Sequence, residues 1–306
     1  MNDPIIERAC LFGTNESLFG ILSTPAQTGS ARGPTIVILN TGTTHRVGHH
    51  RMSVSLARAL AAQGYPAFRF DFAGVGDSRP SDSGAPLLES NLADIRSALD
   101  WLTTTLHSSC FVLLGLCSGA DYAVMYSHTD ARVVGLVLLD PFVPKTPRYV
   151  IGYMRSRFAN PRSLLRFRPG KSVLVRALFP STLGPRGEAA ELGHISFHGQ
   201  NPRKTLQAIY ERNIATGMQI LVFCTALPSS PRHTYEGQFA EAFKVAKFGD
   251  QLRVKLLRDC DHMFSSPSNR DILGEATIGW MTSAMFRSSA SSIEGANNPT
   301  QESSMA

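Results

Sequence analysis

The stretch LLGLCSGA, residues 113–120, decides the fold of this chain. It joins an apolar run, residues 110–115, to a helical pattern, residues 118–127, through a sharp turn. A reactive side chain on such a strand–turn–helix needs small residues two places before and after it, because strand and helix pack closely there. Gly115 and Gly119 flank Cys117 in this way, whereas Leu116 and Ala120 would flank Ser118. The register therefore predicts Cys117 as a nucleophile.

The alternative is that Cys117 is a small buried hydrophobic residue, as free cysteines often are. That interpretation leaves the two flanking glycines unexplained. The turn also puts Cys117 at a helix N-terminus, where the partial positive charge is expected to favour the thiolate.

Short apolar runs alternate with helical patterns on both sides of this turn. Near-continuous apolar strands separated by helices predict a mostly parallel sheet with helices on both faces. An antiparallel start is expected before residue 35, at residues 7–12 and 18–22. The other expected strands are residues 35–40, 66–71, 110–115, 133–140, 219–225 and 252–257, and the expected helices are residues 52–63, 91–106, 118–127 and 272–286.

Residues 141–218 form a long interruption of this alternation, too long for a loop in a compact domain. They predict an inserted helical lid in a core made of residues 1–140 and 219–286. The lid holds 13 Lys or Arg against three acidic residues, a charge of +10 in a chain of net charge +6. This surface is either simply solvated or a dock for an anionic partner, such as an acidic acyl carrier protein, coenzyme A or a lipid headgroup. Residues 287–306, rich in Ser, Asn and Glu, predict a disordered tail.

A general base for Cys117 is expected after the last strand, and His262 lies there. Chains with such a nucleophile turn carry the nucleophile, the acid and the histidine in that order. The competing histidines are His198, His233 and the cluster His45, His49 and His50.

The acid that orients His262 is less clear from the sequence. Its usual position follows residues 219–225, but no carboxylate occurs there before Glu236. Asp140, at the end of the preceding strand, is the first choice and Glu236 the second, with Glu241 and Asp250 as outside candidates. The acid is also dispensable in principle, because a thiol needs less activation than a hydroxyl.

Two backbone N–H groups are expected to stabilise an oxyanion beside Cys117. One belongs to Ser118, the residue after the nucleophile. The other is expected in the loop NTGTT, residues 40–44, where Thr43 is the first choice and Thr44 the second. A plain glycine turn is the alternative for this loop.

The composition indicates which classes of protein do not fit this chain. The chain is 43% hydrophobic and 18% charged, with no apolar stretch long enough to span a membrane. Its first ten residues include Asp3, Glu7 and Arg8 and do not resemble a secretory signal, so a cytoplasmic location is expected. Five cysteines without metal-like spacing predict neither a disulfide framework nor a metal site. No cofactor and no nucleic-acid partner are expected.

Several motifs together resemble the exosortase-A-associated α/β-hydrolases. They are RVGHHR (46–51), LARALA (56–61), RFDFAGVGDS (69–78), NLADI (91–95) and GLCSGA (115–120). The resemblance implies the α/β-hydrolase fold and covalent catalysis, without naming a substrate. The cysteine at the nucleophile elbow is also similar to that of dienelactone hydrolases, polyester synthases and cyclases that release chains from carrier proteins.

The expected function is acyl transfer through an acyl-Cys117 thioester, on carrier-bound or coenzyme-A-bound donors. Acyltransferase, cyclase and thioesterase activities all fit this chemistry. The alternatives are a simple carboxylic ester hydrolase and, in a different class, a non-catalytic ligand receptor on a hydrolase fold.

Overall fold

Eight strands form one sheet in a computed structural model that describes residues 4–27, 33–158, 202–227 and 232–283. The strand order is β1-β2-β4-β3-β5-β6-β7-β8. β1 and β2 form an antiparallel hairpin, β2 pairs with β4 antiparallel, and all the later pairs are parallel. The strands are β1 (Ile5–Phe12), β2 (Leu18–Pro25), β3 (Thr35–Ile38), β4 (Ala67–Phe70), β5 (Phe111–Leu116), β6 (Val133–Leu139), β7 (Gln219–Ala226) and β8 (Leu252–Arg258). The prediction of a mostly parallel sheet with an antiparallel start is confirmed.

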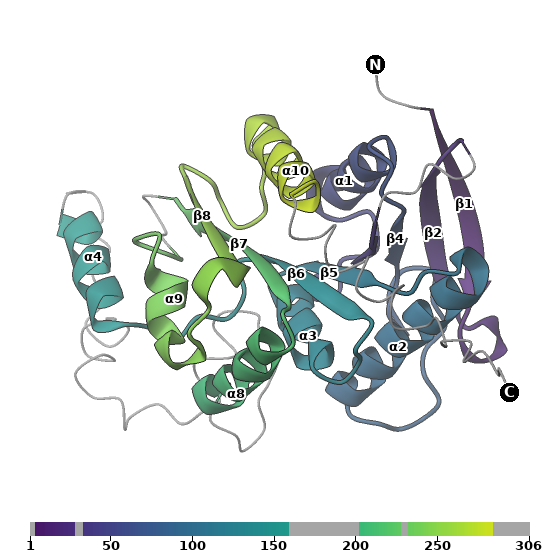
Figure 1. The fold of residues 1–306 in the computed structure, drawn as a ribbon, viewed down its shortest axis with the longest axis horizontal. Helices are drawn as coiled ribbons and strands as arrows, with labels where there is room; N and C mark the ends of the chain where they lie inside the picture. Colours follow the sequence, from purple (N-terminus) through teal and green to yellow (C-terminus); the bar gives the residue numbers. More distant parts are fainter. Residues whose placement is uncertain (1–3, 28–32, 159–201, 228–231, 284–306) are drawn as a thin grey trace, which may run out of the picture.

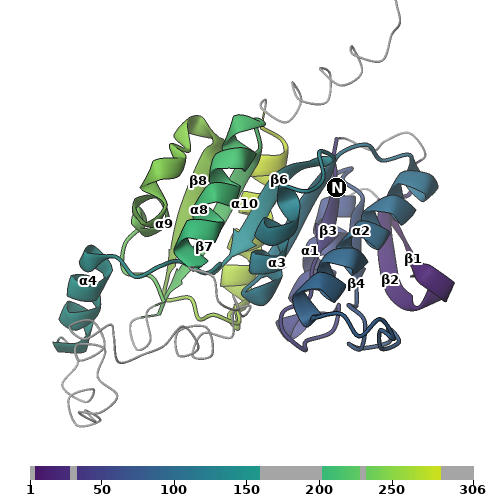
Figure 2. The same ribbon diagram turned by 90° about the horizontal axis from the view of Figure 1, so that it is seen from below.

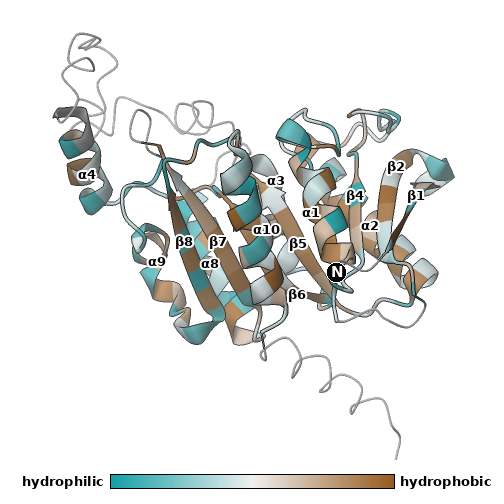
Figure 3. Cartoon of the chain, turned by 90° about the horizontal axis from the view of Figure 1, so that it is seen from above, coloured by the Kyte–Doolittle hydropathy of each residue, from teal (hydrophilic) through white to brown (hydrophobic). Residues whose placement is uncertain are grey.

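Helices cover both faces of this sheet. α1 (Met52–Ala61) and α10 (Pro267–Met281) lie on one face and bury apolar side chains against it (Figures 1 and 3). The opposite face carries α2 (Leu87–Leu106), α3 (Ser118–Ser127), α8 (Pro202–Ala215) and α9 (Gln238–Ala242), as Figure 2 shows. β3, β4 and β5 are buried along their whole length, which explains their near-continuous apolar sequences.

The two described helices of the expected insertion, residues 141–218, lie in different places relative to the sheet. α4 (Pro147–Phe158) extends away from the sheet (Figure 1), and residues 159–201 lie outside the described residues. α8 falls within the expected insertion, residues 141–218, but packs onto the sheet as a core helix. Leu206, Ile209 and Tyr210 are buried in the same cluster as α2 and α3, and Asn213 donates a hydrogen bond of 2.7 Å to Ser127. The expected tail, residues 287–306, also lies outside the described residues, so the domain boundaries stay a prediction.

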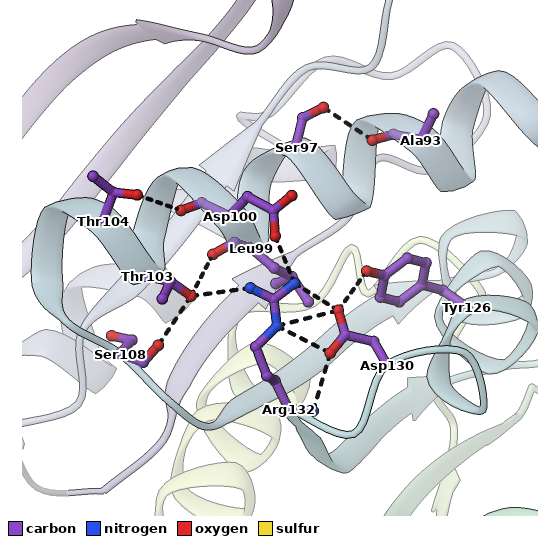
Figure 4. A network of polar contacts seen from close by, with 10 residues as sticks. All are labelled: Ala93, Ser97, Leu99, Asp100, Thr103, Thr104, Ser108, Tyr126, Asp130 and Arg132. Atoms are coloured by element: carbon purple, nitrogen blue, oxygen red, sulfur yellow. Dashed lines mark hydrogen bonds and ion pairs between the residues drawn. The ribbon is translucent and has the colours of Figure 1, made fainter.

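A polar network ties the helix layer to the sheet at the end opposite the nucleophile turn (Figure 4). Arg132, just before β6, pairs with Asp130 and with Asp100 of α2, each at 2.7 Å. Tyr126 of α3 donates a hydrogen bond of 2.7 Å to Asp130. Burial alone raises the pKa of Asp130, but the bonds from Arg132 and Tyr126 outweigh it and lower the pKa to about 2. The ionised carboxylate therefore stabilises the fold above its ordinary pKa, and this contribution is lost as the pH falls towards 2.

Across the described ranges, none of the helices has both the length and the apolar character needed to cross a bilayer.

Candidate active site

Cys117 lies on a strained turn between β5 and α3. Its backbone has φ 55° and ψ −119°, a conformation that costs energy for a non-glycine residue. A Cβ on Gly115 would lie 2.2 Å from the carbonyl carbon of Gly119, and a Cβ on Gly119 would lie 2.4 Å from the carbonyl oxygen of Asn40. Both positions therefore exclude any side chain, which is the packing requirement from which the register of Cys117 was predicted.

The sheet register brings the end of β6 next to this turn. Leu116, the last residue of β5, pairs with Leu139, the last residue of β6. The amide of Cys117 donates to the carbonyl of Leu139 at 2.9 Å. Asp140 follows directly, with a positive φ of 44°, and its amide donates to Phe223 of β7 at 2.8 Å. Cys117 and Asp140 thus leave neighbouring strands at the same edge of the sheet.

Asp140 contacts His262, as the first-choice acid was expected to. Nδ1 of His262 lies 2.8 Å from Oδ2 of Asp140, and the Asp140 side chain is 1% exposed. Thr225 of β7 holds the same carboxylate through its amide at 2.7 Å and its hydroxyl at 2.5 Å. Burial by itself raises the pKa of Asp140, but the imidazoles of His233 and His262 outweigh it and hold the pKa well below its usual range. The buried carboxylate of Asp140 thus holds the imidazole of His262 through Nδ1.

The alternative acids lie elsewhere. Glu236 and Asp250 are exposed, and Glu241 accepts a hydrogen bond of 2.7 Å from Tyr235. None of the three makes a described contact with His262, so Asp140 is the carboxylate that the structure brings to it.

The competing histidines have different surroundings. His45 and His50 are exposed, whereas His49 is half-buried with Nε2 3.3 Å from the hydroxyl of Thr44. Burial, followed by the charges of His262 and His50, lowers the pKa of His49. His233 is buried on the other side of Asp140. His198 lies outside the described residues.

The environment of Cys117 differs from the sequence-based expectation of a stabilised thiolate. Burial and the charge of Asp121 raise the pKa of Cys117 to about 11, although Arg232 and the Ser118 amide act in the opposite direction. Asp121, in the first turn of α3, is 1% exposed and accepts a 2.8 Å hydrogen bond from the Phe142 amide. Burial and the charge of Asp121 thus oppose the helix N-terminus and favour the neutral thiol of Cys117.

The loop after β3 lies against the nucleophile turn, where the oxyanion site was expected. The amide of Gly42 donates to the Ser118 hydroxyl at 2.7 Å, and the Thr41 hydroxyl donates to the Leu116 carbonyl at 3.1 Å. Thr44 uses its amide inside the loop, donating to Thr41 at 2.9 Å. The Thr43 amide makes no such bond within the described residues and stays the first choice. The Ser118 side chain has a role the sequence did not reveal, because it holds this loop.

A network of polar side chains that the sequence did not reveal also holds this loop. Asp71, 0% exposed at the end of β4, accepts hydrogen bonds from the Arg46 amide at 2.5 Å and the Asp77 amide at 3.1 Å. The Arg46 guanidinium pairs with Asp71 and, at 2.6 Å, with Asp77. Asn40 donates to the Thr44 carbonyl at 2.8 Å. Polar residues near the ends of neighbouring parallel strands, Asn40 two residues after β3 and Asp71 one residue after β4, were the available signal.

A family model, described as the alpha/beta hydrolase family, matches residues 36–273. With the sheet order, the strained turn at Cys117 and the contact of Asp140 with His262, this match defines the class of protein: the chain belongs to the alpha/beta hydrolase family. No curated protein matches it.

Solved structures share the fold at low sequence identity. Est1E from Butyrivibrio proteoclasticus, with ferulic acid bound, is 13% identical at a TM-score of 0.54 and covers 86% of this chain and 94% of its own. An esterase of Pyrococcus furiosus is 12% identical at a TM-score of 0.53, covering 90% of both chains. A fungal esterase of Rhizomucor miehei is 14% identical at a TM-score of 0.56, covering 94% of this chain and 86% of its own. These similarities establish the architecture alone.

Proposed function

We propose that this hydrolase-family chain is an acyl-transfer enzyme that works through an acyl-Cys117 thioester. The observation that carries the proposal is the position of Cys117 on a strained elbow whose flanking glycines admit no side chain. Strain of this kind persists where the surrounding structure enforces it, typically at functional sites. Asp140 follows β6, the strand that pairs with β5 before Cys117, and its contact with His262 supports the same conclusion.

The chemistry follows from the raised pKa of Cys117. Because the resting group is a thiol, His262 removes its proton as the sulfur attacks the acyl carbon. The carbonyl oxygen becomes an oxyanion, which the amides of Thr43 and Ser118 stabilise. Collapse of this intermediate expels the donor's thiol or alcohol, which takes the proton from His262, and leaves the acyl group on sulfur. An acceptor then gives its proton to His262, attacks the thioester and regenerates the Cys117 thiol.

Asp140 keeps the imidazole in the productive tautomer. A carboxylate beside Nδ1 accepts a hydrogen bond from the N–H there, so that Nε2 is the basic nitrogen. The imidazolium that forms during attack is stabilised by the same buried negative charge. Asp140 therefore serves the step in which a neutral thiol must lose its proton.

The donor class we favour is an acyl thioester on an acidic acyl carrier protein or on coenzyme A. The support is the +10 charge of residues 141–218, which suits an anionic donor. An acyl-enzyme thioester is also open to attack by alcohols, amines or carbon nucleophiles as well as by water, so acyltransferase, cyclase and thioesterase activities share these steps. We place the enzyme in the cytoplasm, where such donors are found.

Simple ester hydrolysis is the second candidate. It is supported by the esterases among the structural neighbours. The same residues would act in the same roles, with an alcohol as the leaving group and water as the acceptor. The contact of Asp140 with His262 is an argument against the non-catalytic receptor, because a receptor needs no carboxylate held against a histidine.

The test presents one acyl chain in three forms: an oxygen ester, a coenzyme A thioester and a carrier-protein thioester. Turnover is measured with wild type and Cys117→Ala, with water alone and with added alcohol or amine acceptors. The proposal expects faster turnover of the thioesters, partition to the acceptor, and loss of turnover in Cys117→Ala. Preference for the oxygen ester with no transfer would support the second candidate, and full activity of Cys117→Ala would contradict both.

A further inference from the structure

His233 lies on the far side of the Asp140 carboxylate from His262. Its Nδ1 is 3.4 Å from Oδ1 of Asp140, whereas His262 approaches Oδ2 at 2.8 Å. The His233 side chain is 4% exposed, and its amide donates to the carbonyl of Thr225 at 3.2 Å. One buried carboxylate is therefore held between two imidazoles.

His233 lies in the chain segment where a triad acid is expected. It belongs to the segment after β7, which usually supplies the triad acid in this family but here carries no carboxylate before Glu236. In this chain the carboxylate is Asp140, at the end of β6, and the segment after β7 places a histidine beside it. Thr225, which itself donates twice to Asp140, anchors that histidine through the backbone.

The charges around His233 favour its protonated form. The groups that face it are Asp140 after β6, Cys224 on β7 and, across the carboxylate, His262 after β8. Although burial by itself lowers the pKa of His233, the Cys224 sulfur and the Asp140 carboxylate outweigh it and raise the pKa above its ordinary value. Nδ1 of His233 is buried without a hydrogen-bond partner among the described residues, and its contact with Oδ1 of Asp140 at 3.4 Å is that of an ion pair.

We propose that His233 is a positioning residue of this site, which shares the buried Asp140 carboxylate with His262 and weakens the pull of that carboxylate on the His262 imidazole. The negative charge of Asp140 favours protonated His262, and a neighbouring positive charge opposes it. His233 thereby keeps His262 deprotonated, and able to act as a base, at lower pH than Asp140 alone would allow. The role in catalysis rests on the proposed function, whereas the shared carboxylate does not.

The first measurement needs no substrate. The imidazole resonances of isotope-labelled wild-type protein are followed by NMR across pH 5 to 9, with His233 and His262 assigned through correlations to their backbone resonances. We expect His233 to remain an imidazolium at pH 8, well above the ordinary midpoint of about 6.5. A neutral His233 at pH 7 would overturn the proposal, whatever the behaviour of any variant.

The second measurement uses His233→Asn, which retains an N–H donor near the position of Nδ1 but carries no charge. The titration midpoint of His262 should rise by about one pH unit, and the acid limb of kcat/KM should move with it. The matched control is His128→Asn, because His128 also has a buried Nδ1 without a hydrogen-bond partner in the described residues but lies at the other end of α3.

The outcomes separate the two proposals. A purely structural role would lower activity equally at every pH and leave the His262 midpoint unchanged, and that result would contradict the positioning role. If both titrations behave as expected but no acyl donor is turned over, the proposed function is contradicted, whereas the proposal that His233 and His262 share Asp140 is supported. If His233→Asn does not fold, the wild-type titration still decides.

Discussion

The thiol of Cys117 is subject to opposing influences at the residue scale. The start of α3, the Ser118 amide and Arg232 favour negative charge on sulfur, whereas burial and the carboxylates of Asp121 and Asp140 oppose it. Their balance raises the pKa of Cys117 to about 11. In the proposed mechanism the base must therefore remove the proton during attack, as it does for a serine nucleophile.

Alkylation of Cys117 tests this balance. Only the thiolate reacts with iodoacetamide, so the rate at Cys117 should rise about tenfold per pH unit from pH 6 to 9. Rates are measured by peptide mapping, which separates Cys117 from the partly exposed Cys10 and Cys110. A rate that is already constant below pH 7 would indicate a preformed thiolate–imidazolium pair instead.

Substitution of the acid tests its assignment. Asp140→Asn should lower kcat/KM by a factor on the order of 10²–10⁴, because an amide can hold His262 in the wrong tautomer. Glu236→Gln, at an exposed residue, should stay close to wild type. Both are compared on the same acyl donor, with folding checked by circular dichroism. Unchanged turnover in a folded Asp140→Asn variant would remove Asp140 from the mechanism.

At the scale of elements, the two glycines of the elbow connect fold and function. Gly119 of α3 lies against Asn40, the residue that opens the predicted oxyanion loop. The close approach of α3 to β3 thus sets the distance between Cys117 and that loop. The same approach explains why the pattern of small residues was visible in the sequence.

Gly119→Ala should therefore damage stability and activity together. Its Cβ would meet backbone that cannot yield cheaply, so we expect a loss of about 1–3 kcal/mol in the free energy of unfolding. The control is Gly274→Ala on α10, where an added Cβ meets nothing within 4 Å and should stabilise the helix by about 0.5–1 kcal/mol. Denaturant unfolding measures both. Equal stability of the two variants would contradict the close packing at the elbow.

Elements with a strong local pattern were predictable from the sequence. The residues of α3 coincide with the prediction, and each expected strand lies within a few residues of an observed one. Cys117 and His262 follow from such patterns, because the turn and the chain order locate them. Asp140 remained one of several choices, since its contact with His262 spans 122 residues and depends on strand register.

Features created by tertiary packing were not predictable in this way. α8 was assigned to the insertion because it falls within the long interruption at residues 141–218. Its buried side chains Leu206, Ile209, Tyr210 and Asn213 nevertheless pack it against the core. His233 was considered only as a competing base, because its distance from Asp140 is invisible in sequence. The raised pKa of Cys117 opposes the expected thiolate, because sequence reveals the helix N-terminus but not the depth of burial.

At the scale of the whole molecule, charge is unevenly distributed along the chain. Residues 141–218 carry +10, although the net charge is only +6, so the remainder is slightly acidic. If residues 141–218 receive an acidic carrier protein, association is steered electrostatically and weakens as salt screens it, with a Debye length of about 8 Å at physiological ionic strength.

Charge reversal tests the docking of a carrier. Arg166→Glu with Arg168→Glu should raise KM for a carrier-bound donor and leave a small neutral ester unaffected. The control reverses Arg253 and Lys255, an equally basic exposed pair on β8. KM is measured across a salt series for both donors. Identical responses of the two donors in all three proteins would reject the docking surface and leave an ordinary small-ester hydrolase.

Mass spectrometry of the acyl-enzyme tests the central claim most directly. Wild type, Cys117→Ala and Ser118→Ala are mixed with a panel of acyl thioesters, quenched in acid, and examined as intact proteins and as fragmented peptides. We predict one acyl mass on Cys117 in wild type, none in Cys117→Ala, and acylation that persists more slowly in Ser118→Ala, where the hydroxyl that holds Gly42 is lost. An acyl group on Ser118, or acylation that survives in Cys117→Ala, would contradict the account.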